Sequence, residues 1–490
     1  MTTANQKQPA TKTFSPRIAL FDPSTLAQIH DRSAAILENV GVKLPHDGVR
    51  RMLVEKGAHV ETEGQIVKIP RKLIEQAVKE STKTYRLYNA QGEPTAHFGL
   101  GKRNYNSIAG EASWFDGRTR RASRLGDVVT AAHIAEQLDH LNITGAMADP
   151  QELPPQVRCI HVAATLLKYT RKPFTFWYYD GPSAAYINEL LIAAAGSVEQ
   201  AKARPRTYAF LEPISPLSFP RDGLDVVYQT RDLNLPVSIG PMAQAGATAP
   251  VTLAGTIVQE NAEILAGICI TQLVQPGAAI CYGGIPHAFG MRSTQMVFAG
   301  PEQALMAVGL TQMGKFYGLP VYINVGLTDS KVSDAQAGLE IASTLILGAL
   351  AGADIFGHFG VCGVDQATSL DILLLQHEIA CYVERLLQGI DIDDERYACD
   401  LIEQVGPGGN FLAEDHTAAH YRSQMWFPSL LDRNFFEIWD QQGRKETSDR
   451  IAERKNELLA KPAEVVIDPT TAKELDKIVA AAERDLLKKT

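Results

Sequence analysis

The sequence predicts an α/β fold, a (β/α)8 TIM barrel with an N-terminal α+β extension and a C-terminal helical extension. Eight short β-prone runs follow residue 104, and helical stretches separate them. The runs begin roughly 30 to 40 residues apart, about the length of one βα unit. The glycine-rich fingerprint of a nucleotide-binding open sheet is missing, which disfavours the doubly wound alternative.

Residues 1–104 are expected to form the N-terminal extension. The stretch 22–42 predicts a helix, because Thr25 and Gln28 have the spacing of a capping box. The stretch 85–99 alternates β-prone residues around a turn and predicts a hairpin.

Residues 105–390 are expected to form the barrel, whose strands share β-branched or aromatic residues and a turn signal at one end. The expected strands are YNSIAG (105–110), NITGAMADP (142–150), PFTFWYY (173–179), TYAFLEPIS (207–215), PVSIGPMA (236–243), AAICYGG (278–284), PVYINVG (320–326) and DIFGHFG (354–360). The intervening helices include VRCIHVAATLLKY and LEIASTLILGALAG.

Residues 391–490 are charged and helical, and form the predicted C-terminal extension. Its last stretch places Leu475, Val479, Ala482 and Leu486 on one helical face. Such a stripe is expected to pack on the body of the protein or on a second subunit, so a homo-oligomer built through these helices is one expectation.

Composition narrows the class of protein. The chain has 490 residues, of which 45% are hydrophobic, and a net charge of −9 without an extended Lys/Arg cluster, which argues against nucleic-acid binding. No uninterrupted apolar run has the roughly 18 residues of a membrane span. The N-terminus lacks the apolar core of a signal peptide, and the six cysteines form no CxxC pair. We expect reduced thiols in a cytoplasmic protein.

In a TIM barrel the active site lies at the carboxyl ends of the strands. The residues found at these expected ends are Glu111, Trp177–Asp180, Glu212, Met242–Gln244, His287, Asp329, Lys331, His358, Phe359 and Gln366. This rim combines aromatic rings and carboxylates with few cations. It suits a cation that cannot donate hydrogen bonds, such as a quaternary ammonium, which ring faces and negative potential can hold.

The stretch PFTFWYYDGP (173–182) places five aromatic residues in six positions at the end of one expected strand. Strand alternation puts Phe174, Phe176 and Tyr178 on one face and Trp177 and Tyr179 on the other. At most half of these rings can therefore line one cavity. The alternative is that all of them belong to the core and the surface rim.

Two further patterns suggest different chemistry. His416 and His420 have the spacing of metal ligands on a helix, but no third ligand is evident nearby, so no metal site is expected. Asp329 and His358 would suit the acid and base of a barrel lyase or hydrolase.

Longer stretches carry a family resemblance. ILENVGVKLPHDGVRRMLVEKGAHVE, VKIPRKLIEQAV, TDSKVSDAQAGLEIAST, GADIFGHFG and VGPGGNFLAEDHT resemble the trimethylamine methyltransferase family of corrinoid-dependent enzymes, from about residue 20 to 460. The resemblance implies a barrel that moves a methyl group from an amine to the cobalt of a separate corrinoid protein. That corrinoid (cobalamin) partner would dock at the barrel mouth.

The trimethylamine enzymes of this family carry pyrrolysine in a segment that matches roughly 327–331 here. This chain has only standard residues there, in GLTDSK. It therefore resembles the pyrrolysine-lacking branch, which demethylates quaternary amines such as glycine betaine, proline betaine, carnitine and γ-butyrobetaine. A quaternary nitrogen already carries the positive charge that makes its methyl group displaceable.

The resemblance turns the strand-end residues into candidates with roles. Candidates for an aromatic box around the ammonium are Trp177, Tyr179, Phe356 and Phe359. Asp329 and Glu212 would balance the cation, His358 would orient the substrate or protonate the product, and Lys331 would meet a substrate carboxylate. Asp329 and His358 are the catalytic candidates. A protein that kept the betaine pocket without turnover is the remaining alternative.

Overall fold

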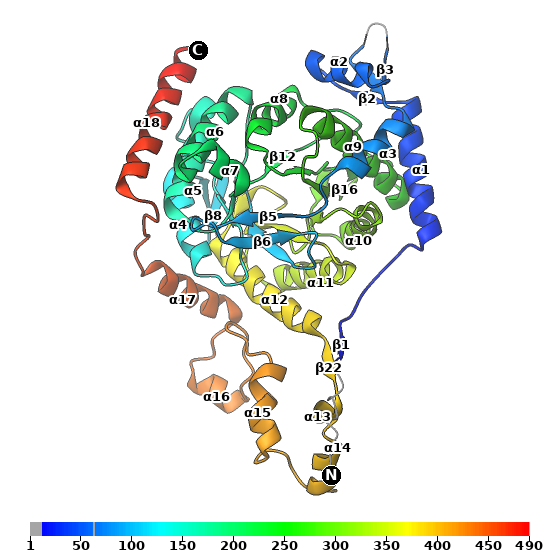
Figure 1. Cartoon of the computed structure of the whole chain (residues 1–490). Helices are drawn as coiled ribbons and strands as arrows, with labels where there is room; N and C mark the ends of the chain where they lie inside the picture. The colour runs from blue at the N-terminus through cyan, green and yellow to red at the C-terminus, as the bar shows by residue number, and fades with distance from the viewer. Residues whose placement is uncertain (1–11, 62–63, 490) are drawn as a thin grey trace, which may run out of the picture.

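The computed structural model describes residues 12–61 and 64–489, and its centre is a barrel of eight parallel strands (Figure 1). Six strands form one sheet in the order β12-β13-β15-β18-β19-β7. β10 pairs with β11 in parallel, and Asn106 of β7 forms a bridge with Ile143 beside β10. The amide of Phe174 donates to the carbonyl of Arg206, 2.9 Å away, which joins β11 to the β12 side. These links complete the ring.

Every barrel strand overlaps one of the eight runs that the sequence predicts, so the predicted fold class is confirmed. The strands are β7 (Asn104–Ser107), β10 (Thr144–Gly145), β11 (Phe174–Thr175), β12 (Ala209–Leu211), β13 (Val237–Ile239), β15 (Ile280–Gly284), β18 (Val321–Ile323) and β19 (Ile355–Phe359). Most of their residues are buried on both faces, as expected for parallel strands between a core and a ring of helices.

Helices follow the strands and cover the outside of the barrel. They are α4 (Leu125–Glu136), α5 (Pro155–Tyr169), α6 (Gly181–Ala195), α7 (Val198–Ala203), α8 (Arg221–Thr230), α9 (Leu253–Val274), α10 (Pro301–Phe316), α11 (Ala335–Ala351) and α12 (Leu370–Gln388). Asp180 caps α6 by accepting from the amide of Ser183 at 2.7 Å, and Gly196 ends it in the left-handed conformation with φ 85°.

Among the described residues one helix, α9, is long and apolar enough by length and composition to cross a membrane. However, 72% of its most apolar window is buried inside the protein. It also buries the side chains of Glu260, Asn261 and Glu263. Its contacts with α1, α3 and α10 are those of a core helix.

The N-terminal extension comprises β1 (Lys12–Phe14), α1 (Pro23–Asn39), β2 (Val42–Lys43), α2 (Asp47–Glu55), β3 (His59–Val60), β4 (Ile66–Lys68), α3 (Arg71–Glu80), β5 (Tyr85–Tyr88) and β6 (Pro94–Phe98). The expected capping box at Thr25 and Gln28 is wrong. The carboxylate of Asp22 caps α1 instead and accepts from the amide of Thr25 at 2.7 Å.

The β5–β6 hairpin closes the amino end of the barrel, and Figure 1 shows it lying across the barrel. Leu87 and Phe98 of the hairpin share an apolar cluster with Tyr208 and Tyr322 of the barrel interior. The buried carboxylate of Asp354 accepts from the amides of Gly99 and Val321 at 2.9 and 2.8 Å, and also from Lys315. Access to the interior is therefore left to the carboxyl end.

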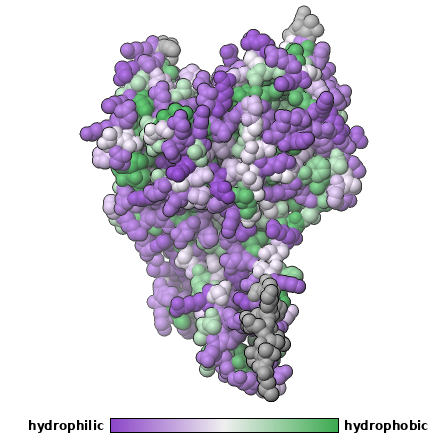
Figure 2. Space-filling model, viewed as in Figure 1, coloured by the Kyte–Doolittle hydropathy of each residue, from purple (hydrophilic) through white to green (hydrophobic). Residues whose placement is uncertain are grey.

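The C-terminal extension comprises β22 (Ile390–Ile392), α13 (Asp394–Tyr397), α14 (Cys399–Val405), α15 (Asp415–Gln424), α16 (Phe436–Gln441), α17 (Thr447–Leu459) and α18 (Pro469–Leu486). α18 packs on α5 and α6 and buries Leu475 and Ala482, so its expected apolar stripe covers the body. The segment from α13 to α16 projects below the body, and none of these four helices has a buried residue (Figures 1 and 2).

Candidate active site

A pocket of about 480 Å³ opens at the carboxyl ends of β11, β12 and β13. Its wall consists of Trp177, Tyr178, Tyr179, Phe210, Glu212, Pro213, Ile214, Ser215, Pro220, Asp222, Gly223, Met242, Gln244 and Thr248. We call it the mouth pocket. Barrel enzymes bind their substrates at this end, on the loops that follow the strands.

The aromatic stretch after β11 divides as alternation predicts. The rings of Phe174, Phe176 and Tyr178 form a chain with centroids 5.9 and 4.7 Å apart and pack with the core, and Tyr178 also borders the mouth pocket. Trp177 turns the other way and makes edge contacts with Phe210 at 6.1 Å and with His358 at 6.0 Å. Its indole Nε1 donates to the carbonyl of Gly110 at 2.8 Å, which fixes the orientation of the ring.

Three buried carboxyl groups influence one another at the carboxyl end of the barrel, and one of them, Glu212, lines the mouth pocket. Burial, together with the nearby charge of Asp365, raises the pKa of Glu212 to about 7. Burial also raises the pKa of Asp365, and burial with the charges of Asp365 and Asp149 raises that of Glu111. In the described part of the chain, no lysine or arginine forms an ion pair with Glu212, Asp365 or Glu111. Lys331 lies next to Gly363, two residues before Asp365, without forming an ion pair with these carboxyl groups.

Asp365 reaches this cluster on a short hairpin, β20 (Val361–Cys362) and β21 (Ala367–Thr368), that follows the last barrel strand. Gly363, Val364 and Asp365 are three consecutive left-handed residues, with φ of 63°, 63° and 57°. Two of the three carry a Cβ atom, so this tip is strained. Strain of this kind is concentrated at functional sites, and here it positions a carboxyl group whose charge acts on Glu212.

His358 lies inside the barrel, with its ring 5.9 Å from that of Tyr322. Burial lowers its pKa to about 3, so the imidazole is neutral near neutral pH. His287, the next histidine in the interior, is fully buried, stacks on Phe298 at 4.7 Å, and has its pKa lowered to about 3 by burial. Neither ring is placed to act as an acid at pH 7.

In the described part of the chain, several buried polar side-chain atoms on or near the barrel strands have no hydrogen-bond partner. They are Nδ1 of His358, both ring nitrogens of His287, both amide atoms of Asn324 and Oδ1 of Asn106. Buried polar groups normally find partners in the protein or in bound molecules. Their presence here indicates an interior prepared for polar contacts with a ligand or water.

Phe356 and Phe359, which the resemblance offers for an aromatic box, lie outside the mouth pocket. Both are fully buried and contact the ring of Tyr105, with centroids 5.2 and 5.6 Å away. A register shift between the two phenylalanines and a left-handed His358, with φ 73°, break the alternation of β19. His358 therefore points into the barrel, whereas both phenylalanines point out of it.

The two candidates in the loop after β18 do not line the mouth pocket either. Asp329 accepts from the amide of Phe298 at 3.0 Å, and burial raises its pKa. Lys331 is exposed, and its Nζ donates to the carbonyl of Asp329 at 2.8 Å. The structure thus gives both side chains a role in holding this loop.

Sequence reasoning missed Phe210 and Asp365 as candidates. Phe210 precedes Glu212 by two residues on β12, so the same alternation that places Glu212 inside the barrel would have found it. Asp365 carries no such signal, because its position depends on the three left-handed residues of the hairpin tip.

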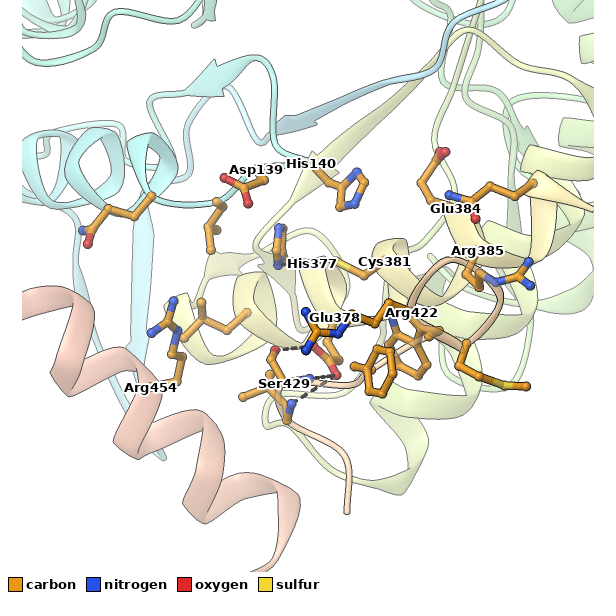
Figure 3. Close-up of a pocket in the computed structure, with 18 of the residues that line it drawn as sticks. Asp139, His140, His377, Glu378, Cys381, Glu384, Arg385, Arg422, Ser429 and Arg454 are labelled. Atoms are coloured by element: carbon orange, nitrogen blue, oxygen red, sulfur yellow. Dashed lines mark hydrogen bonds between the residues drawn. The ribbon is translucent and has the colours of Figure 1, made fainter. Parts of the chain in front are cut away.

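A larger pocket, of about 640 Å³, lies away from the mouth, between α12 and the C-terminal extension (Figure 3). His377 and Glu378 of α12 form one wall, and Arg422 and Ser429 of the extension form the other. Glu378 has a structural role, because its carboxylate accepts hydrogen bonds from the hydroxyl and the amide of Ser429. Helix α12 ends at the amino side of the barrel, so this pocket lies opposite the expected catalytic end.

The rings of His416 and His420 lie with centroids 4.4 Å apart at an interplanar angle of 52°, and His420 contacts Glu395 at 3.2 Å. Within residues 12–61 and 64–489, no group of three or more His, Cys, Asp or Glu side chains could hold a metal ion. All six cysteines are free thiols, of which four are buried.

A barrel with its pocket at the carboxyl ends of the strands has the architecture of a TIM-barrel enzyme. The chain belongs to the trimethylamine methyltransferase family, whose model matches residues 1–486. Trimethylamine methyltransferase MttB of Desulfitobacterium hafniense is 28% identical over 475 residues, covering 96% of this chain and 94% of the relative. Glycine betaine methyltransferase of the same species is 28% identical over 477 residues, covering 96% and 98%.

Among solved structures, the monomethylamine methyltransferase of Methanosarcina barkeri aligns with 96% of this chain and 88% of its own, at 11% identity and a TM-score of 0.47. The assignment to the family is based on the sequence comparisons, and the assignment of the barrel fold is based on the strand pairing described above.

Proposed function

We propose that this chain transfers a methyl group from a quaternary amine to the cobalt(I) of a corrinoid carried by a separate protein. Glycine betaine, which would become dimethylglycine, is the first candidate substrate. The observation that supports this is the mouth pocket, which combines the rings of Trp177 and Phe210 with the carboxyl groups of Glu212 and Asp222. Proline betaine, carnitine and γ-butyrobetaine are the other candidates.

The binding chemistry follows from the substrate charge. A quaternary ammonium has no N–H group, so it is recognised by aromatic faces and negative potential rather than by donated hydrogen bonds. Trp177 supplies a ring whose orientation is fixed by Gly110, and Glu212 supplies the negative potential beside it. A bound cation would also stabilise the ionised carboxylates, which repel one another in its absence.

The proposed reaction needs no base to begin. The nucleophile comes from the partner protein and attacks the methyl carbon in line with the departing nitrogen. The quaternary nitrogen leaves as a neutral tertiary amine without prior activation. This chain would contribute placement of the substrate near its attack geometry, within a fixed electrostatic environment.

The relatives carry two different substrate names at the same 28% identity, so similarity does not choose between them. The chemistry favours the quaternary amine. A tertiary amine is a poor methyl donor unless its nitrogen is made cationic, and residues 327–331 of this chain are all standard amino acids. A quaternary amine needs no such activating group.

The corrinoid is the methyl acceptor of the partner and would approach through the open mouth. The amino end of the barrel is closed by the β5–β6 hairpin, so the mouth pocket is the accessible end. Lys331 stays a candidate for the substrate carboxylate, but it lies outside the wall of the mouth pocket and its Nζ donates to the carbonyl of Asp329. Gln244, which is one of the residues lining the mouth pocket, is the donor that we propose for that carboxylate.

The function is tested by mixing the protein anaerobically with free cob(I)alamin and each quaternary amine, and following absorbance. Loss of the cobalt(I) band together with methylcobalamin and the demethylated amine would support the proposal and identify the substrate. Trimethylamine serves as the matched tertiary donor. Transfer from trimethylamine alone would reject the proposal, as would no transfer from any quaternary amine with either free corrinoid or corrinoid protein.

Tyr179→Phe is expected to lower the free energy of unfolding by about 1.5 kcal/mol and to leave the affinity for the quaternary amine within twofold. The hydroxyl of Tyr179 donates to Asp149, which also pairs with Arg158 at 2.9 Å. The hydroxyl is therefore engaged with the protein and is not needed for the substrate. Urea unfolding and calorimetric titration would measure the two quantities. More than fivefold weaker binding would mean that the hydroxyl contacts the substrate.

A further inference from the structure

Four aromatic rings in the barrel contact one another in a closed cycle, which we call the ring cycle. In order around it they are Trp177, which follows β11, Phe210 of β12, Tyr322 of β18 and His358 of β19. Neighbouring centroids lie 6.1, 5.6, 5.9 and 6.0 Å apart, and each pair meets edge to face at interplanar angles of 65° to 76°. Among the described residues, neither diagonal pair of the cycle makes a ring contact. The four rings therefore surround a common centre.

Two glycines on neighbouring barrel strands leave the space that two of these rings occupy. A Cβ atom at Gly357 of β19 would collide with the hydroxyl of Tyr322. A Cβ atom at Gly240, directly after β13, would lie 2.6 Å from Cζ of Phe210. A side chain at either position would displace the ring, so the absence of a side chain there fixes where the ring can lie.

The ring cycle adjoins the mouth pocket, because Trp177 and Phe210 belong to both. Tyr322 and His358 are buried in the barrel. Burial lowers the pKa of His358 to about 3, so its ring is neutral near neutral pH and does not repel a cation. Glu212, two residues after Phe210, adds a carboxyl group in the wall of the pocket. The cycle therefore combines four uncharged rings with an acidic group at its open side.

An arrangement of this kind matches the chemistry of a quaternary ammonium. A cation is attracted to an aromatic ring when it lies within about 6 Å of the ring centroid. Because the sides of the cycle measure 5.6 to 6.1 Å, a point at its middle lies within about 6 Å of all four centroids. A trimethylammonium group has no hydrogen to donate, so rings stabilise it better than hydrogen-bond acceptors do.

We propose that the ring cycle binds the trimethylammonium head group of the substrate, and that Tyr322 and His358 determine which head groups fit. This inference rests on the proposed function and deepens it, because it assigns the head group to the rings and leaves the mouth pocket to the rest of the substrate. The carboxylate of glycine betaine would then lie in the mouth pocket, toward Gln244. The short sides of the cycle would limit the substituents on the bound nitrogen to methyl groups.

The first test uses the wild-type protein and two simple cations. In titration calorimetry without corrinoid, tetramethylammonium chloride is expected to bind about 10-fold more tightly than tetraethylammonium chloride. An open apolar surface would give the reverse order, because the ethyl groups bury more apolar area. Tetraethylammonium that binds as tightly as tetramethylammonium would overturn the inference, and so would tetramethylammonium that does not bind.

The second test removes single rings. Tyr322→Leu and His358→Asn are each expected to weaken the binding of tetramethylammonium about 10-fold, whereas Tyr322→Phe, which keeps the ring, should stay within about twofold. Asparagine tolerates the left-handed backbone of position 358, so His358→Asn decides the question if Tyr322→Leu does not fold. Phe356→Leu is the matched control, because Phe356 is a fully buried ring of β19 that packs on Tyr105 outside the cycle. Its affinity should equal that of the wild type.

Thermal melts establish which variants are folded, and methyl transfer is measured separately from binding. Folded His358→Asn with wild-type affinity would overturn the inference, as would an equal loss of affinity in Phe356→Leu. A wild type that demethylates no quaternary amine but binds tetramethylammonium through these rings would reject the proposed function and support the ring cycle as a binding site. An active wild type whose affinity does not depend on Tyr322 or His358 would reject the ring cycle alone.

Discussion

Trp177→Ala is expected to weaken the binding of glycine betaine by about 2 kcal/mol, or roughly 30-fold in Kd. The indole face is held toward the barrel interior by its Nε1 bond to Gly110 and by edge contacts with Phe210 and His358. A cation over a fixed, partly desolvated ring gains more than one at an exposed site. Calorimetric titration without corrinoid measures the loss directly.

A neutral isostere separates the charge effect from packing. In 3,3-dimethylbutanoate a carbon replaces the ammonium nitrogen of glycine betaine, so its binding should fall much less than that of betaine in Trp177→Ala. Trp439→Ala is the matched control, since its Nε1 likewise donates to a backbone carbonyl, that of Lys445 at 3.1 Å, but far from the barrel. Equal losses for betaine and the isostere would mean that Trp177 contributes only volume.

The barrel could be predicted from the sequence because buried parallel strands are short, apolar and regularly spaced between helices. The eight β-prone runs could be recognised from the local sequence, without knowledge of long-range contacts. The cap of α1 was predicted wrongly, since Asp22 and Thr25 are both good capping residues and only the backbone conformation at Asp22 decides between them.

The candidate site was predicted best where strands are regular. Trp177 and Glu212 follow from alternation and from the carboxyl-end rule, and the structure places both in the mouth pocket. The prediction failed for Phe356 because the chain shifts register before His358. A one-residue shift reverses the side-chain direction, and the sequence does not mark where it occurs.

The carboxyl cluster lay beyond sequence reasoning for a different reason. Glu212 and Asp365 are 153 residues apart in the chain, and their encounter depends on the closure of the barrel and on a strained hairpin tip. Burial raises the pKa of both groups and the charge of Asp365 raises that of Glu212 further, and both effects are properties of the folded arrangement. Residue type and spacing could identify Glu212 as a candidate, but they could not show that the charge of Asp365 acts on it.

Asp354→Ala is expected to lower the free energy of unfolding by about 3 to 5 kcal/mol, a large share of the stability of a typical domain. The side chain is only 3% exposed and accepts from Lys315 and from the amides of Gly99 and Val321. Its loss would leave a lysine and two amides without their acceptor at the amino end of the barrel. The shift of the urea midpoint measures the cost.

Hydrogen exchange at single amides and two comparison variants test whether the loss in Asp354→Ala comes from the contacts of this carboxylate. Hydrogen exchange should quicken first at Gly99, which follows β6, because that amide anchors the hairpin that closes the barrel. Asp476→Ala removes the partner of Lys168 from a site where the carboxylate is 66% exposed, and should cost less than about 1 kcal/mol. Asp354→Asn should fall between the two, since an amide oxygen can still accept but cannot balance the lysine charge. If Asp354→Ala proved no more destabilising than Asp476→Ala, the hairpin would be held by its apolar contacts with the barrel interior alone.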